Sequence, residues 1–244
     1  MIRLTRSEKP TYLSDSKVKE LTDEFKATGN SVWRNRQIVE PLLASSFGKC
    51  AYCECRLTEE SKYVEVEHFL NKNDFPDLVV KWINLLPACK RCNASKSTHD
   101  VGTSPIINPY EDTPKNHVTM RFYRMVGLDE KGDTTIDVVS LNDTDRATTK
   151  RFQIGEQLHS NIADIGDKLE KFISEETVIR RNKLVSAVRN LLRECQRKAE
   201  YAATAATIVV NDQKFLKVLA AMQGMGLWSA ELSALHEEAN DIAL

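Results

Sequence analysis

Two pairs of cysteines, each with the spacing Cys-x-x-Cys, constrain the fold of this chain more than any other feature. Cys50 and Cys53 form the first pair, Cys89 and Cys92 form the second, and 35 residues lie between the pairs. Each pair can present two thiolates to one ion, and two pairs complete the tetrahedral all-sulfur shell of a structural zinc site. Such a site contributes roughly 10–16 kcal/mol to folding, more than a short irregular segment gains from packing.

Two further cysteines stand outside this pattern. Cys55 closely follows the first pair, but its spacing does not mirror the second pair, so we treat it as a spare thiol. Cys195 lies in a helical pattern and is expected in a core. The alternative interpretation is that the paired cysteines are buried thiols or include a redox-active pair, although a redox motif is a single pair close to a βαβ unit.

Composition places the chain among ordinary soluble proteins. Of its 244 residues, 41% are hydrophobic and 28% are charged. No run approaches the roughly 18 apolar residues that cross a bilayer, and the N-terminus lacks an apolar signal core, so we expect a cytoplasmic location without membrane contact. The net charge is −1, whereas proteins that bind DNA unaided have a basic excess. Either the basic residues are clustered or a partner supplies part of the grip on nucleic acid.

The patterning predicts an α+β fold in three regions. We expect a helical lead-in over residues 1–48, a cysteine-bounded domain over residues 49–142, and a helical region over residues 143–244. Within the middle region, residues 118–125 and 134–140 alternate on either side of a Gly- and Asp-rich segment, which predicts a β-hairpin. Proline is absent from the last region, and its apolar spacing is typical of a small helical bundle.

Local signals refine this outline. Apolar spacing in the lead-in predicts two helices, the first capped by Ser14 or Asp15 and the second kinked or split by Pro41. Alternation that includes Tyr63 predicts a short strand ending at His68. A further helix is expected to start at the second cysteine pair, near Cys92 or Asn93.

Five polar residues inside or just after the cysteine-bounded segment suit phosphodiester hydrolysis: Glu67, His68, Asn84, Asn93 and Lys96. The reaction needs a base to activate water and a divalent cation to neutralise developing charge. His68 suits the base, while the oxygens of Glu67 and Asn93 suit Mg²⁺ or Mn²⁺. Asn84 is expected to hydrogen-bond the loop backbone and keep His68 aimed. Lys96 is left open between a phosphate contact and a solvated charge.

These segments together resemble the HNH endonuclease family with zinc-binding cysteine pairs. The segments that carry the resemblance are CAYCE from Cys50, VEHF from Val66, WINL from Trp82 and CKRCNASK from Cys89. The resemblance implies a ββα-metal core clamped by zinc.

The family's roles fall on matching positions of this chain. The resemblance implies that His68 is the general base, that Glu67 and Asn93 bind the catalytic metal, and that Asn84 is structural. Aspartate is the commoner family residue where this chain has Glu67, and the longer side chain puts the position of the metal in doubt. The Asn at position 93, in place of His, is a variant that the family also uses.

The similarity extends over roughly residues 1–150 to the HNH nuclease component of Septu and retron-type anti-phage defence systems. The additional matching segments are Lys9-Pro10, the Trp33 region up to Lys49, the Asn108–Asp112 loop with His117, and Leu141-Asn142 with Arg146. This resemblance implies a DNA substrate and a companion ABC-like ATPase. The helical remainder is less diagnostic.

Three alternatives remain open from the residues alone. The chain could be a non-catalytic zinc module that binds nucleic acid or protein, or an RNA-directed nuclease toxin that shares the same chemistry. Asn93 could be a helix N-cap instead of a ligand. The basic residues between Arg180 and Lys198 form either a solvated face or a DNA or partner surface, and the apolar faces of the last helices suit a core, an ATPase partner or a homodimer.

Overall fold

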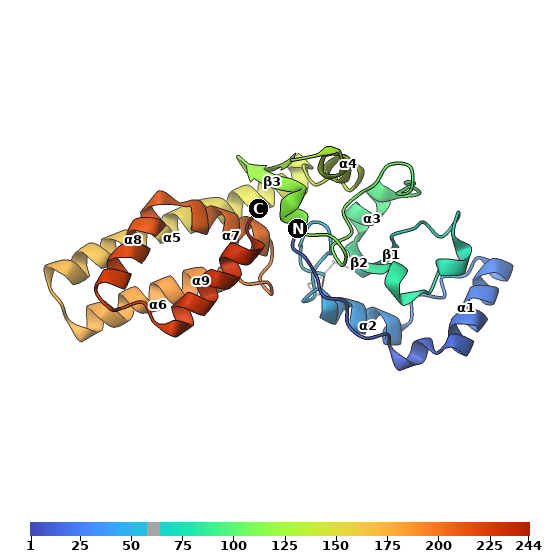
Figure 1. Cartoon of the computed structure of the whole chain (residues 1–244), viewed down its shortest axis with the longest axis horizontal. Coiled ribbons are helices and arrows are strands. Elements are labelled where there is room, and N and C mark those ends of the chain that lie inside the picture. The colour runs from blue at the N-terminus through green and yellow to red at the C-terminus, as the bar shows by residue number, and fades with distance from the viewer. Residues whose placement is uncertain (58–63) are drawn as a thin grey trace. The chain divides into compact units, whose positions relative to one another are not determined.

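The computed structural model describes residues 1–57 and 64–244. The chain forms two compact units: the first consists of Met1–Thr119 and Met125–Asp143, and the second consists of Met120–Arg124 and Thr144–Leu244. Helices and two small two-stranded sheets build the described residues (Figure 1), so the α+β class is confirmed. Within these residues, no helix is both long enough and apolar enough to span a membrane.

The first unit opens with the two predicted helices, α1 (Asp15–Thr28) and α2 (Arg36–Ser45). Ser14 caps α1, because its hydroxyl accepts a hydrogen bond from a first-turn backbone amide. The helix ends at Gly29, whose φ of 72° places it in the left-handed region that favours glycine. Pro41 does not split α2, which runs unbroken through it.

A two-stranded sheet and a helix follow, and they carry most of the residues singled out in the sequence. Strands β1 (Val64–His68) and β2 (Leu85–Cys89) pair antiparallel, and α3 (Lys90–Lys96) packs against both strands. The predicted strand end at His68 is confirmed, while Tyr63 lies outside the described residues.

Helix α3 begins at Lys90, earlier than the predicted start near Cys92 or Asn93. The Cys89 sulfur accepts a hydrogen bond from the Cys92 amide at 3.4 Å and thereby caps the helix. The alternative that Asn93 is the N-cap of this helix is therefore wrong, and the Asn93 side chain has no capping role.

The predicted hairpin between residues 118–125 and 134–140 is also wrong. Strands β3 (Val118–Arg121) and β4 (Arg124–Gly127) pair with each other instead. The two residues between them, Phe122 and Tyr123, have φ of 46° and 64°, the backbone of a tight two-residue hairpin turn made without glycine. The second predicted strand is part of a helix, α4 (Glu130–Val138), because Asp129 accepts a hydrogen bond from the Gly132 amide and caps it.

Short 3₁₀ turns link the elements of the first unit in the described ranges. They are η1 (Thr11–Leu13), η2 (Pro76–Leu78), η3 (Trp82–Asn84) and η4 (Pro114–Asn116). Arg6 fixes η3, since its guanidinium donates hydrogen bonds to the carbonyl oxygens of Trp82, Ile83 and Leu85 at 2.7, 3.0 and 2.9 Å. The segment that carries Asn84 is thus tied to the start of the chain.

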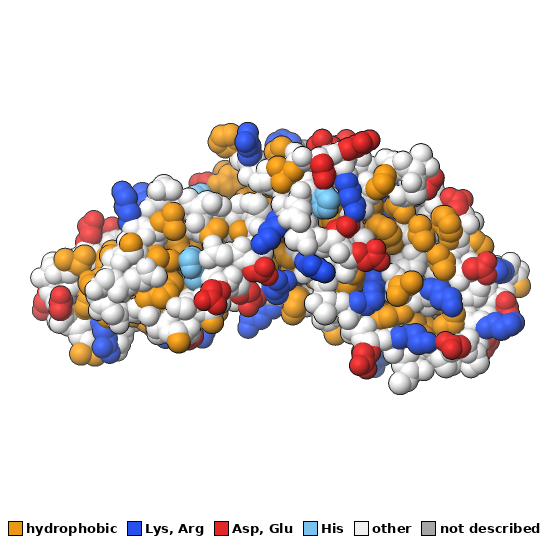
Figure 2. Space-filling view, viewed as in Figure 1, with side chains coloured by type: hydrophobic (Ala, Val, Ile, Leu, Met, Phe, Trp, Pro, Cys, Tyr) orange, Lys and Arg blue, Asp and Glu red, His pale blue; other side chains and the backbone are white. Residues whose placement is uncertain are grey.

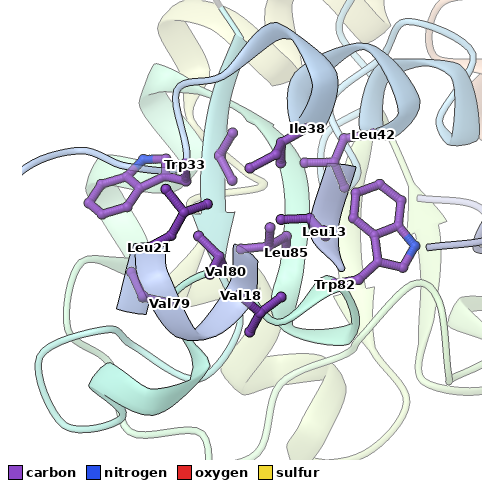
Figure 3. Close-up of a cluster of buried hydrophobic side chains, with 11 residues drawn as sticks. Leu13, Val18, Leu21, Trp33, Ile38, Leu42, Val79, Val80, Trp82 and Leu85 are labelled. Atoms are coloured by element: carbon purple, nitrogen blue, oxygen red, sulfur yellow. The ribbon is translucent and has the colours of Figure 1, made fainter. Parts of the chain in front are cut away.

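A hydrophobic core cluster of the first unit lies between α1, α2 and the β1–β2 sheet. It contains eleven buried side chains, among them Leu13, Ile38 and Leu42 at 0% exposure. Figure 3 shows Trp33 at one edge of this cluster, near Leu21 and Val79, and Trp82 at the other edge. The core therefore reaches from the N-terminal helices to the segments that flank β1 and β2, which makes the two helices part of the same unit as the sheet.

The second unit is helical, as predicted. A π-helical turn (Thr144–Thr148) leads into α5 (Thr149–Ser174), α6 (Val178–Glu194), α7 (Ala202–Asn211), α8 (Gln213–Gly224) and α9 (Ala230–Ile242). Helix α7 contacts the other four helices, and every residue from 202 to 209 is buried. A helix that is apolar on all sides belongs at the centre of a bundle, which explains why α7 carries alanine, threonine and valine instead of a polar face.

Candidate active site and metal centre

The four paired cysteines meet in one cluster. The sulfur atoms of Cys50, Cys53, Cys89 and Cys92 all lie within 4.8 Å of one another. Cys53 and Cys89 are 3.8 Å apart, and a tetrahedral ion with Zn–S bonds of about 2.3 Å separates its sulfurs by about 3.8 Å. All six cysteines of the chain are free of disulfides. The arrangement therefore suits one zinc ion bound by four thiolates.

Backbone hydrogen bonds hold the first pair against the sheet. The Ala51 amide donates to the carbonyl oxygen of Pro87 in β2 at 2.9 Å, and the Cys50 amide donates to the Cys55 carbonyl oxygen at 2.9 Å. Side-chain hydrogen bonds with Cys50, Cys53 and Cys89 raise the pKa of the Cys55 thiol, so Cys55 lies beside the cluster. Cys55 is nevertheless not one of the four sulfurs that lie mutually close enough to share one ion.

His68 stands at the end of β1 with a defined tautomer. Its Nε2 lies 2.8 Å from the carbonyl oxygen of Val79. A carbonyl only accepts hydrogen bonds, so Nε2 carries the proton and Nδ1 is left unprotonated. Burial lowers the pKa of His68 to about 4, assisted by Lys72 and Lys96 and opposed by the bond to Val79. The ring is therefore neutral at pH 7, with one nitrogen free to accept a proton.

The hydrophobic core orients this imidazole. The Trp33 indole meets the His68 ring edge-to-face, with 4.7 Å between ring centroids and 83° between planes. Trp33 is 7% exposed and belongs to the core cluster in Figure 3. Packing on one side and the Val79 hydrogen bond on the other hold the ring in one rotamer.

Asn84 closes the loop between β1 and β2 from inside. It is buried, its Oδ1 accepts from the Leu70 amide at 2.7 Å, and its Nδ2 donates to the carbonyl oxygens of Leu70 and Leu78 at 3.0 and 3.2 Å. Leu78 immediately precedes Val79, whose carbonyl holds His68. Asn84 thus fixes the backbone on which the orientation of His68 depends and does not itself line the cavity described below.

Glu67 precedes His68 and is paired with Lys96. The Lys96 ammonium lies 2.7 Å from Glu67 Oε1, outside hydrogen-bond alignment, and donates to the His68 carbonyl oxygen at 3.0 Å. Burial raises the pKa of Glu67 to about 7, although Lys96 acts in the opposite direction. Lys96 is 1% exposed, so the alternative of a solvated surface charge is wrong. Its ammonium is engaged with β1, and a phosphate contact stays a prediction.

A cavity of about 320 Å³ brings Glu67, His68 and Asn93 together. The residues that line it come from the segment between α1 and α2, from β1 and the loop after it, and from α3 and the residues that follow α3. They are Gly29, Ser31, Trp33, Arg34, Glu65, Val66, Glu67, His68, Asn71, Lys72, Asn73, Asn93, Ser97 and Thr98. The two basic residues among them, Arg34 and Lys72, were not singled out from the sequence, and Trp33 was named only as part of a segment that carries the resemblance. The nearest signal was the Asn- and Lys-rich stretch directly after the strand that ends at His68, which places Lys72 beside the base.

The basic residues between Arg180 and Lys198 are largely paired within the second unit. Arg189 and Arg193 both contact Glu231, and Arg197 contacts Asp241. On the face shown in Figure 2, basic and acidic side chains are interspersed over the surface. These observations favour the solvated-face interpretation of the basic run over a DNA-binding stripe.

Comparisons with known proteins support the Septu part of the resemblance. No family model matches the chain. The Septu protein PtuB of Bacillus mycoides strain KBAB4 is 28% identical over 165 residues, which cover 54% of this chain and 55% of that protein. The Septu protein PtuB of Bacillus thuringiensis is 44% identical over 241 residues, which cover 98% of this chain and 93% of that protein. With this identity over nearly the full length of both proteins, the chain belongs to the Septu PtuB family.

Proposed function

We propose that this protein is a metal-dependent endonuclease of the HNH type that hydrolyses phosphodiester bonds of DNA. The observation that carries the proposal is the neutral His68, held by Val79 with Nδ1 unprotonated, on the same cavity as Glu67 and Asn93. In this interpretation β1, β2 and α3 are the ββα-metal core, and the four cysteines are its structural zinc site. A binding module has no need of an oriented base beside two oxygen ligands.

The residues on the cavity fit a catalytic divalent cation. Glu67 offers a carboxylate and Asn93 offers an amide oxygen, both hard donors of the kind that Mg²⁺ and Mn²⁺ prefer. Two protein ligands leave most of the coordination sphere of such an ion to water and phosphate. Bound there, the cation would neutralise charge that develops on the phosphate during hydrolysis.

The residues of the chain divide the remaining work. His68 would take the proton of the attacking water at Nδ1 and keep its other ring nitrogen on the Val79 carbonyl. An anionic phosphate beside the ring stabilises the imidazolium, which brings the pKa of this base up toward neutrality when substrate is bound. Lys72 and Arg34 line the same cavity and would attract the phosphodiester backbone.

We also propose that the nuclease acts in anti-phage defence together with an ABC-like ATPase. The similarity to two Septu PtuB proteins supports the defence assignment. The interspersed surface charges and the net charge of −1 support a partner that supplies part of the DNA grip.

A nicking assay tests the proposal. Zinc-loaded protein, alone and co-purified with an ATPase from the same genetic locus, is incubated with supercoiled plasmid and Mn²⁺ or Mg²⁺. His68→Ala should lower the nicking rate by about 10²-fold or more, whereas His99→Ala, which removes an imidazole that does not line the cavity, should leave it unchanged. Equal nicking by the parent and His68→Ala would overturn the assignment of the base. Competition with RNA decides between a DNA nuclease and an RNA-directed toxin.

A further inference from the structure

The charges around the cavity do not attract a cation by themselves. Among the described residues, Glu65 and Glu67 are the acidic side chains that line it, and Arg34 and Lys72 are the basic ones. Arg34 lies 3.7 Å from Glu65, and the buried Lys96 lies 2.7 Å from Glu67. Within the part of the chain that the structure describes, two carboxylates therefore lie beside three cationic side chains, and the sum of these five charges is positive.

Lys96 decides this balance because it lies at the ligand itself. Both members of the Lys96–Glu67 pair are almost completely buried, with side-chain exposures of 0% and 3%. Solvent screens such a pair far less than a surface pair, so the ammonium strongly offsets the attraction of Glu67 for a second cation. The hydrogen bond from Lys96 to the His68 carbonyl oxygen fixes the ammonium in this place.

We infer that Lys96 makes divalent-cation binding at Glu67 and Asn93 depend on a bound nucleic-acid phosphodiester. This inference rests on the proposed nuclease function. A phosphodiester brings further anionic oxygens, both to bind the cation and to offset the positive charge of Lys72 and Lys96. Cation and nucleic acid then bind cooperatively, and linkage requires each to raise the affinity of the other by the same factor.

Mn²⁺ titrations followed by NMR test the inference without a catalytic readout. Zinc-loaded His68→Ala protein is titrated with and without a short duplex DNA, and paramagnetic broadening of the Trp33 indole NH reports occupancy of the cavity. Trp82, at the opposite edge of the core cluster from Trp33, provides an internal reference signal. DNA should lower the free Mn²⁺ concentration for half-broadening by about tenfold or more, within the usual range of coupling between sites. The same half-broadening concentration in both titrations would overturn the inference.

A charge variant tests the role of Lys96 itself. At a pH high enough to ionise Glu67 in both proteins, Lys96→Met should raise the affinity of the DNA-free protein for Mn²⁺ by roughly tenfold, because one buried positive charge beside the ligand is removed. Lys81→Met removes an exposed lysine of the same unit and should leave Mn²⁺ binding unchanged. Unaltered affinity in folded Lys96→Met protein would contradict the inference, and if that variant does not fold, the comparison with and without DNA still decides.

Different results refute the nuclease proposal and the coupling through Lys96. A parent protein that does not cleave DNA with Mn²⁺ and its ATPase partner refutes the nuclease proposal. A parent protein that cleaves DNA, but binds Mn²⁺ equally well with and without it, refutes only the coupling through Lys96.

Discussion

Asn84 provides a quantitative test of how the loop positions the base. Asn84→Ala removes three hydrogen bonds, one from the Leu70 amide and two to the carbonyl oxygens of Leu70 and Leu78. At about 1 kcal/mol for each bond, the free energy of unfolding should fall by about 3 kcal/mol. Asn84→Asp keeps the acceptor but turns a carboxylate oxygen toward two carbonyls, so it should cost at least about 2 kcal/mol.

Urea unfolding of zinc-loaded protein measures these losses, with exposed Asn30→Ala as the control variant. The nicking rate, measured where every variant is folded, should fall further than the loss of folded protein explains, because Leu78 precedes the Val79 carbonyl that holds His68. An Asn84→Asp variant that matches the parent in both stability and rate would refute this role of Asn84.

Three further predictions concern the metal sites and the core. Cys92→Ser should lose most of its zinc and unfold, whereas Cys55→Ser should keep one zinc ion per chain. Elemental analysis measures the zinc content, and zinc loss in Cys55→Ser would show that Cys55 is a ligand. Because the pKa of Glu67 is raised to about 7, kcat/KM should fall below pH 7 as this ligand is protonated, and the fall should move to lower pH as Mn²⁺ is increased. If the pH at which kcat/KM falls does not change with Mn²⁺ concentration, a group other than Glu67 causes the fall. Trp33→Ala should destabilise the first unit by about 3–5 kcal/mol in urea unfolding, and a loss below about 1 kcal/mol would contradict its place in the core.

Several segments with clear apolar periodicity were predictable, and segments fixed by local backbone chemistry were not. Apolar spacing directly predicts helices α1 and α2, the strand end at His68 and the helical nature of the second unit. The hairpin failed because Phe122 and Tyr123 adopt positive φ, a conformation that their residue types do not signal. Helix α7 was not predicted, since periodicity detects one apolar face and α7 is buried on every side.

The part of the candidate site that lies within sequence motifs was predictable. The four sulfurs lie together, and Glu67, His68 and Asn93 share a cavity, because two cysteine pairs and a strand–strand–helix unit bring these positions close. The burial of Lys96 against Glu67 depends on the packing of α3 on β1, which spacing alone does not reveal. Trp33 reaches His68 from the N-terminal region, and such a contact is visible only in three dimensions.

Chemical rescue of His68→Ala shows whether the imidazole of His68 takes the proton of the attacking water. The substitution should lower the nicking rate by about 10²-fold or more while zinc content and folding stay intact. Added imidazole should then restore part of the rate, with a dependence on the concentration of its neutral form. A folded, zinc-loaded His68→Ala protein that nicks DNA as fast as the parent would contradict the account.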